Sequence, residues 1–132
     1  MSLILKKVLY SSLILLAIDS IYLKMISKMF NEMIQNIQGT RIFGRGSAAV
    51  FCYAFIILGI NYFIIVPEKS VLDAAILGLV TYGIFETTNS FIFKKWELIP
   101  TIIDTLWGAI LFGVTTYFTY RLVGVRDLWK KV

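Results

Sequence analysis

The sequence predicts an all-α integral membrane protein, a four-transmembrane-helix up-down bundle with an amphipathic interfacial segment between helices one and two. Of its 132 residues, 58% are hydrophobic and 16% are charged, and the mean hydropathy is +0.80. A soluble domain is nearer half apolar and about a quarter charged. Four apolar runs each reach the ~20 residues that a helix needs to cross a bilayer. At this length we expect one integral membrane domain, residues 1–132.

The predicted spans cover residues 3–26, 47–66, 71–93 and 99–123, with edges good to a few residues. The first carries Asp19 and lacks a small-x-small cleavage site, so we interpret it as a retained span rather than a secretion signal. Pro67 closes the second span. The short links 67–70 and 94–98 force antiparallel neighbours, which predicts the up-down order. Two small-x-x-x-small pairs would let helices approach closely, Ala74 with Gly78 and Ala109 with Gly113.

The segment between the first two spans has helical periodicity of its own. Apolar side chains such as Met29, Met33 and Ile37 recur opposite polar ones over residues 27–38, and Gly39 follows. This predicts an amphipathic helix that either lies at the membrane interface or continues the first span, and that ends at Gly39. Docking of a partner is the alternative use of such a helix, and interfacial anchoring is preferred.

The charge and residue content exclude several function classes. The net charge is +5, but the basic residues lie at the ends of apolar runs, which is typical of headgroup anchors and argues against nucleic-acid binding. Histidine is absent, which removes the usual general base, haem ligand and main zinc ligand. Cys52 is the single cysteine, so no internal disulfide forms. We expect no cofactor.

The basic residues only slightly favour one orientation of the protein in the membrane. One end of the bundle carries seven: Lys6, Lys7, Lys69, Arg121, Arg126, Lys130 and Lys131. The other end carries six: Lys24, Lys28, Arg41, Arg45, Lys94 and Lys95. The positive-inside rule therefore favours, weakly, a multi-pass protein with both termini in the cytoplasm. The tail 126–131 is expected to anchor at the interface.

Three acidic residues lie inside the predicted spans at one depth. Asp19, Glu86 and Asp104 are five, eight and nine residues from the lysines that bound their spans at the same end of the bundle. At 1.5 Å per residue, all three lie within roughly 7–14 Å of that surface. An ionised carboxylate inside hydrocarbon is costly, so each one needs a partner, a proton or water.

Helical spacing gives each acid its neighbours. The stripes are Ser12, Leu15, Asp19 and Tyr22; Tyr82, Glu86 and Asn89; and Asp104, Trp107, Gly108 and Leu111. We expect these stripes to meet inside the bundle, with Tyr53 as a further contributor. The candidate polar cluster or ion pathway comprises Asp19, Tyr22, Tyr53, Tyr82, Glu86, Thr88, Asn89, Trp96, Asp104 and Trp107. Taken singly, Trp96 is most simply an interfacial belt residue. Two alternative roles remain for the acids. Asp19, Glu86 and Asp104 could bind a metal ion, or they could serve only to fix the register of the helices.

These motifs carry a family resemblance. Segments 18–23, 82–89 and 104–108, with Trp96 between the last two, resemble small four-helix membrane proteins catalogued as domain of unknown function two-one-seven-seven. That family has Asp-x-x-Trp in helix one, Tyr-Asp-x-Thr-Asn in helix three and Asp-x-x-Trp-Gly in helix four. The chain departs from the pattern at Tyr22, Phe85 and Glu86. Glutamate in place of aspartate moves the charge out by one methylene, which counts against tight metal geometry. The resemblance implies the fold and the site, and it implies no activity.

Three functions are compatible with buried intramembrane acids. A passage for protons, cations or a small solute ranks first, because acids near an aqueous entrance serve such pathways. A structural or assembly subunit of a membrane complex ranks second. A membrane-embedded enzyme acting on a lipid or isoprenoid ranks third, because the sequence has no visible nucleophile–base pair and no dense acidic motif. The expected partners are the lipid bilayer, a proton or cation, and further copies of the chain as a homo-oligomer.

Overall fold

Four long helices and one short π-helix make up the computed structural model, which describes residues 1–129. The elements are α1 (Leu3–Gln38), α2 (Gly46–Ile60), η1 (Asn61–Ile65), α3 (Val71–Ile92) and α4 (Leu98–Val123). No strand occurs within residues 1–129. The all-helical prediction is therefore confirmed. Lys130 and Lys131, which the orientation and tail-anchor arguments used, lie outside the described residues.

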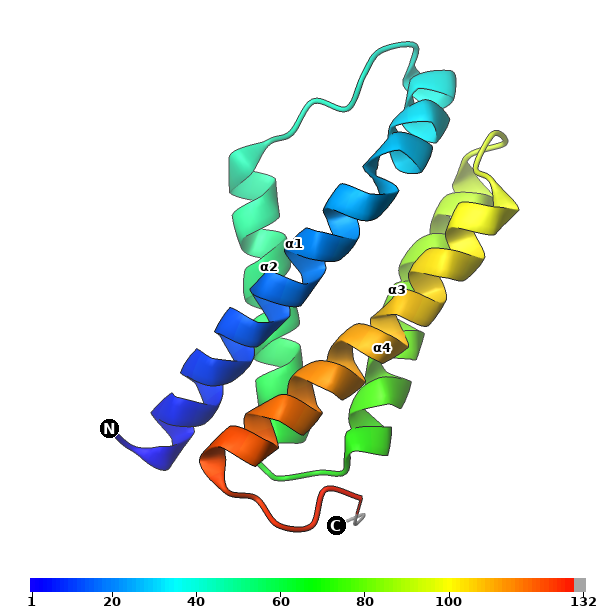
Figure 1. Ribbon diagram of the computed structural model, residues 1–132. Coiled ribbons are helices and arrows are strands. Elements are labelled where there is room, and N and C mark those ends of the chain that lie inside the picture. The colour runs from blue at the N-terminus through cyan, green and yellow to red at the C-terminus, as the bar shows by residue number, and fades with distance from the viewer. Residues whose placement is uncertain (130–132) are drawn as a thin grey trace.

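The helices alternate in direction, as Figure 1 shows. α1 rises from the N-terminus, α2 and η1 descend, α3 rises again and α4 descends, so the N-terminus and the last turn of α4 lie at the same end of the bundle (Figure 1). α3 and α4 make the most extensive contact, α1 packs mainly on α4, and α2 touches α1 only slightly. The up-down prediction is confirmed, with α2 as the loosely attached member.

The helix ends follow from identifiable cap residues. The Ser2 and Ser70 side chains accept hydrogen bonds from the backbone N–H groups of Leu5 and Asp73, which caps the first turns of α1 and α3. At the other ends, Gly39 and Gly124 adopt left-handed backbone with φ of 79° and 85°, which terminates α1 and α4. α1 and α4 thus stop where the sequence supplies a glycine that can leave the helical conformation.

Two glycines set the distance between α3 and α4. A Cβ atom added to Gly78 would lie 2.0 Å from the Gly108 carbonyl oxygen, and one added to Gly108 would lie 2.4 Å from that of Gly78. The two backbones are therefore in contact, as small residues allow in membrane proteins. Ala74 and Gly78 are both buried at this contact. From α4, Gly108 makes the close approach, whereas Gly113 makes only an ordinary van der Waals contact with Ala75.

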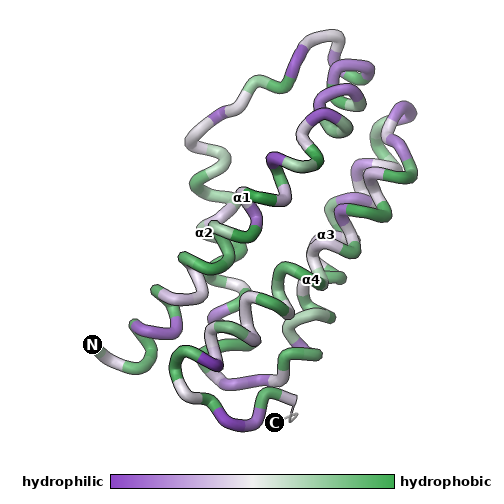
Figure 2. The backbone as a smooth tube through the Cα atoms, viewed as in Figure 1, coloured by the Kyte–Doolittle hydropathy of each residue, from purple (hydrophilic) through white to green (hydrophobic). Residues whose placement is uncertain are grey.

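The outer surface of the bundle is apolar along the middle of the helices. Many large hydrophobic side chains are exposed there, including Leu13 on α1, Phe55 on α2, Ile84 on α3 and Ile110 on α4. In Figure 2 the hydrophilic segments gather toward the two ends of the helices. By length and composition all four helices, with η1 extending α2 to Ile65, are able to cross a membrane. The prediction of four spans is confirmed.

The segment 27–38 continues α1 without a break. α1 contains 36 residues, a length of ~54 Å against a hydrocarbon thickness of ~30 Å. Met33 is fully buried, and its sulfur accepts a hydrogen bond from the Glu97 backbone N–H at 3.3 Å. This end of α1 therefore packs against the turn between α3 and α4, in line with the second of the two predicted arrangements. Its position at the membrane interface stays a prediction.

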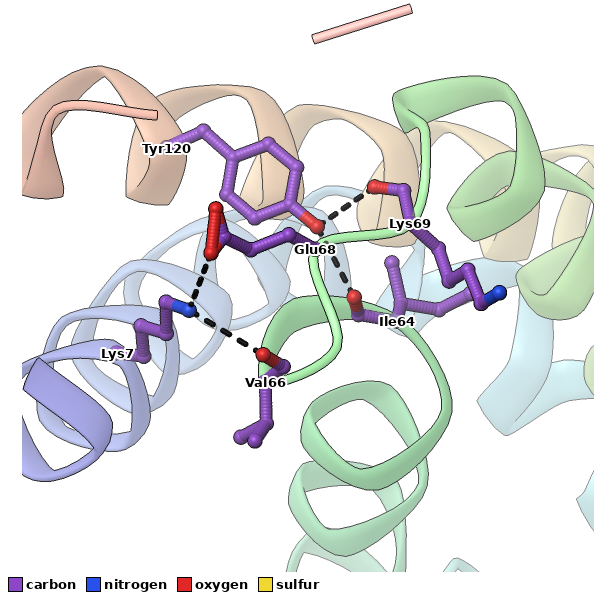
Figure 3. Close-up of polar contacts among 6 residues, drawn as sticks. All are labelled: Lys7, Ile64, Val66, Glu68, Lys69 and Tyr120. Carbon is purple, nitrogen blue, oxygen red and sulfur yellow. Dashed lines mark hydrogen bonds and ion pairs between the residues drawn. The ribbon is translucent and has the colours of Figure 1, made fainter. Parts of the chain in front are cut away.

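Opposite that turn, α1, η1 and α4 are joined by a set of polar contacts around the link into α3. We call this set the tied end: Lys7, Ile64, Val66, Glu68, Lys69 and Tyr120 (Figure 3). The Lys7 ammonium, only 3% exposed, lies 3.1 Å from the Glu68 carboxylate and donates to the Val66 carbonyl oxygen at 3.2 Å. The Tyr120 hydroxyl donates to the backbone carbonyls of Ile64 and Lys69, at 3.0 and 2.6 Å. Side chains from α1 and α4 thus satisfy the carbonyl groups of a segment that leaves regular α-helix at Asn61.

Candidate functional site

The first acid, Asp19, joins three helices. Its two carboxylate oxygens accept hydrogen bonds from different partners, the Trp107 indole N–H of α4 at 2.9 Å and the Tyr53 hydroxyl of α2 at 2.5 Å. All three residues lie within membrane-spanning helices, where a carboxylate without partners is costly. Asp19 therefore holds α2 and α4 against α1 with the two hydrogen bonds that it needs for its own burial.

The third acid, Asp104, makes the reciprocal connection. It accepts a hydrogen bond from the Tyr22 hydroxyl of α1 at 2.8 Å. The Tyr22 and Trp107 rings stack on each other, with centroids 4.3 Å apart and planes inclined by 10°. α1 and α4 thus carry the same arrangement, an acid followed three residues later by an aromatic side chain that donates to the acid of the other helix. The i, i+3 spacing places acid and aromatic on one helix face, which explains why the pattern recurs.

The second acid, Glu86, is the most deeply buried, with 0% of its surface exposed. Its Oε2 accepts a hydrogen bond from the Trp96 indole N–H at 2.8 Å, while Oε1 is buried without a hydrogen-bond partner within residues 1–129. Its acidic neighbour is Asp104. The belt interpretation of Trp96 was therefore incomplete, because its ring nitrogen turns inward to the carboxylate. We call the connected set the acid layer: Asp19, Tyr22, Tyr53, Glu86, Trp96, Asp104 and Trp107.

The acid layer does not gather its carboxylates into one cluster. Across residues 1–129, no three acidic or cysteine side chains lie close enough together to hold a metal ion. Asp19 and Asp104 instead accept hydrogen bonds from the Trp107 and Tyr22 side chains, whose rings stack on each other. A metal ion bound jointly by Asp19, Glu86 and Asp104 is therefore not what this geometry provides.

The remaining predicted site residues divide between the interior and the surface. Tyr82 is half-buried, lies within electrostatic reach of Asp19 and Asp104, and packs edge-on against Phe112 with ring centroids 6.2 Å apart. Asn89 is half-buried, and its backbone carbonyl accepts from the Phe93 N–H. Thr88 is exposed. It lies two positions from Glu86, a turn of ~200° around the helix, so it faces away from the acid layer.

The structure also buries polar residues below the acid layer. On α1 the buried serine is Ser11 rather than Ser12, and Ser11 is paired with Asn61, whose amide nitrogen donates to its hydroxyl at 3.0 Å. The buried face of α1 has a signal in the sequence, because Lys7, Ser11, Leu15 and Asp19 follow one another at intervals of four residues. On α4, three threonines are fully buried: Thr115, Thr116 and Thr119. We call these four hydroxyl residues, with Asn61, the hydroxyl layer.

A partly open cavity of about 520 Å³ adjoins the acid layer. The polar residues that line it include Asp19, Tyr53, Tyr82 and Asp104, and most of the rest of its lining is apolar. Its volume lies within the range of roughly 300–1,000 Å³ found for small-molecule sites. The site therefore combines buried acids with adjoining space.

Comparison with known proteins gives one result. The sequence model of a family described as "Predicted membrane protein (DUF2177)" matches residues 4–122. This match covers all four spans and every candidate site residue. No curated protein and no solved structure matches the chain.

Proposed function

We propose that this chain, which belongs to the DUF2177 family of predicted membrane proteins, provides a passage for protons, small cations or a small solute. The passage would follow the seam where α1 packs on α4, because the Asp19 and Asp104 carboxylates of these helices bond there to Trp107 and Tyr22. Intramembrane acids in the interior of a bundle are the usual components of such pathways.

The observation that carries this proposal is the order of buried residues along the two helices. On α1 the buried residues run Lys7, Ser11, Leu15, Asp19 and Tyr22. On α4, from Thr119 to Asp104, they run in the matching direction: Thr119, Thr116, Thr115, Gly113, Phe112, Leu111, Gly108 and Asp104. Each helix thus presents polar groups, one apolar level, and an acid. A bundle held only by packing has no need of polar side chains on both sides of a single apolar level.

The hydroxyl layer would extend the passage toward the tied end. Thr115 and Asp104 are separated by roughly 16 Å along α4, about half the hydrocarbon thickness. The Thr115 and Thr116 hydroxyl oxygens are buried without a hydrogen-bond partner among the described residues. An unsatisfied buried hydroxyl costs about 1–3 kcal/mol, and a water molecule or a passing solute would satisfy it.

The apolar level between the layers would act as the gate. Leu15 and Leu111 are fully buried and lie, along their helices, between the residues of the acid layer and those of the hydroxyl layer. Hydrophobic constrictions gate other pores by excluding water. Glu86 and Trp96 lie nearest the turn between α3 and α4 and would form the entrance on that side.

Flux into liposomes tests the proposal. Purified protein is reconstituted, a membrane potential is imposed, and proton uptake is followed with an internal pH-sensitive dye. We expect Asp104→Asn and Glu86→Gln to reduce uptake about tenfold, because each removes a group that binds the proton along the path. Glu97→Gln is the matched control, since this exposed acid borders the same turn. Equal uptake by wild type and both variants, for protons, Na⁺ and K⁺ alike, contradicts the proposal.

A structural role for the same acids is the second candidate, and one observation favours it. Asp19 and Asp104 accept hydrogen bonds from side chains of other helices, so they also fix how α1, α2 and α4 are aligned. If this were their whole role, neutral isosteres that keep the protein folded would leave flux unchanged. The same experiment therefore separates the two candidates.

A further inference from the structure

The cavity beside the acid layer opens toward the surroundings of the bundle. Two of its lining residues, Phe55 of α2 and Phe85 of α3, are 69% and 57% exposed. Both lie within membrane-spanning helices, so the surface around them faces the bilayer. α2 has little contact with its neighbours, which leaves this side of the bundle open. A molecule would therefore reach the cavity laterally, from the lipid phase.

The polar part of the cavity is acidic and has no basic counterpart. Asp19 and Asp104 both line it, and within residues 1–129 neither forms an ion pair with lysine or arginine. Their partners are neutral phenol and indole groups, and a carboxylate retains further acceptor capacity beside one or two such bonds. The cavity therefore offers carboxylate acceptors, and no lysine or arginine is among the residues that line it.

We propose that this cavity binds a lipophilic amine, a molecule with a single alkyl chain and an ammonium head group. The ammonium would approach Asp19 and Asp104, and the alkyl chain would lie along the apolar walls formed by α2 and α3. The inference deepens the proposed passage by naming a substrate class, and it rests on that proposal in assigning the same carboxylates to both.

The chemistry of the site selects this class over other amphiphiles. An ammonium group offers three hydrogen-bond donors and the opposite charge to the carboxylates. A fatty acid or a phosphate headgroup would bring a negative charge next to buried acids, which is unfavourable at low dielectric. The ring of Tyr82, which lines the cavity and lies within reach of both acids, offers a face to a cation. An alkane would contact the apolar walls but would offer no hydrogen-bond donor to the Asp19 and Asp104 carboxylates.

The single cysteine allows the test to be made on the natural sequence. Cys52 lines the cavity and is exposed, so its alkylation by a maleimide reports whether the cavity is filled. The rate is measured on the whole protein in nanodiscs, with dodecylamine or dodecanoate at equal mole fraction. We expect dodecylamine to slow alkylation about fivefold and dodecanoate to slow it less than about twofold. Equal protection by both would mean that the cavity binds amphiphiles through their alkyl chains, whatever the charge of the head group. Protection by neither would mean that it binds no amphiphile. Each result overturns the proposal.

Two matched variants keep the test specific. Ala49→Leu fills the cavity from α2 and should abolish protection, whereas Ala48→Leu, at an exposed neighbour outside the lining, should preserve it. A cysteine moved outside the cavity, by Ala48→Cys with Cys52→Ala, corrects for any effect of the amine on the membrane surface. Retained protection in Ala49→Leu, or equal protection at the moved cysteine, contradicts binding in this cavity.

Binding and flux fail independently in this design. The alkylation assay involves no transport, and the proton flux assay contains no amine. Protection of Cys52 by dodecylamine without any flux would leave the binding site standing and remove the passage. Flux that depends on Asp104 without protection of Cys52 would leave the passage and remove the amine site.

Discussion

The tied end and the acid layer solve the same problem by different means. Both bury polar groups inside a membrane bundle and both satisfy them with tyrosine hydroxyls from neighbouring helices. At the tied end the acceptors of Tyr120 are backbone carbonyls, which are fixed by the path of the chain (Figure 3). In the acid layer the acceptors of Tyr22 and Tyr53 are carboxylates on flexible side chains, and a cavity of about 520 Å³ adjoins them. The contrast indicates a fixed joint at one end of the bundle and an adaptable site at the other.

The largest effect is expected where the two regions depend on a common support, the contact of α3 with α4. Gly108→Ala places a Cβ atom 2.4 Å from the Gly78 carbonyl oxygen, which forces the two backbones apart. We expect this substitution to lower the free energy of unfolding by about 3 kcal/mol, at the upper end of the usual cost of overpacking. Equilibrium unfolding in mixed micelles measures it. Gly59→Ala is the control, because nothing lies within 4 Å of its added Cβ, and an equal loss there would contradict this account of the contact.

An intermediate effect is expected in the acid layer. Asp19→Ala removes the acceptor of both Tyr53 and Trp107 and leaves two half-buried donors without this partner. We expect a loss of about 2 kcal/mol in the free energy of unfolding, since interhelical hydrogen bonds in membranes are individually modest. Because Asp19 is also what joins α2 to α4, alkylation of Cys52 should become faster as α2 moves away. If both the free energy of unfolding and the alkylation rate stay unchanged, the Asp19 hydrogen bonds do not hold α2 against the other helices.

The smallest effect is expected from a single hydroxyl at the tied end. Tyr120→Phe keeps the fully buried ring and removes the donor to the Ile64 and Lys69 carbonyls. We expect a loss of about 1 kcal/mol in unfolding free energy, with no change in Cys52 alkylation, because the fixed joint lies at the other end from the cavity. Tyr62→Phe is the matched control on an exposed ring. A change in Cys52 alkylation in Tyr120→Phe would mean that the two ends are coupled, contrary to the contrast drawn above.

The sequence predicts the fold well because length and hydropathy decide it. A run of ~20 apolar residues has few alternatives to a membrane-spanning helix, and short links leave only antiparallel neighbours. The depth of Asp19, Glu86 and Asp104 also follows from the sequence, since helical rise converts residue number into height. Their arrangement into stripes predicts the reciprocal contacts of Tyr22 and Trp107 in outline.

What the sequence does not predict depends on side-chain direction and local backbone geometry. Trp96 follows a turn whose conformation decides whether its indole points outward or toward Glu86, and composition favours the outward choice. The π-helix at residues 61–65 has no composition signal of its own. On α4, Gly108 rather than Ala109 lies at the contact with α3. Neighbouring residues of a helix point ~100° apart, and the sequence does not fix the rotation of α4 to that accuracy. For the same reason, the sequence predicts Ser12 on the inner face of α1, whereas Ser11 is the buried serine.

The central claim is that the acid layer and the hydroxyl layer are two parts of one passage, separated by a single apolar level. Leu111→Asn tests it most directly, because it replaces a fully buried side chain of that level with a polar one of similar size. We predict that proton uptake into liposomes rises about tenfold, and that Asp104→Asn in the same chain removes the increase. Uptake that stays high in the double variant, or does not rise in a Leu111→Asn protein that remains folded, would contradict the account.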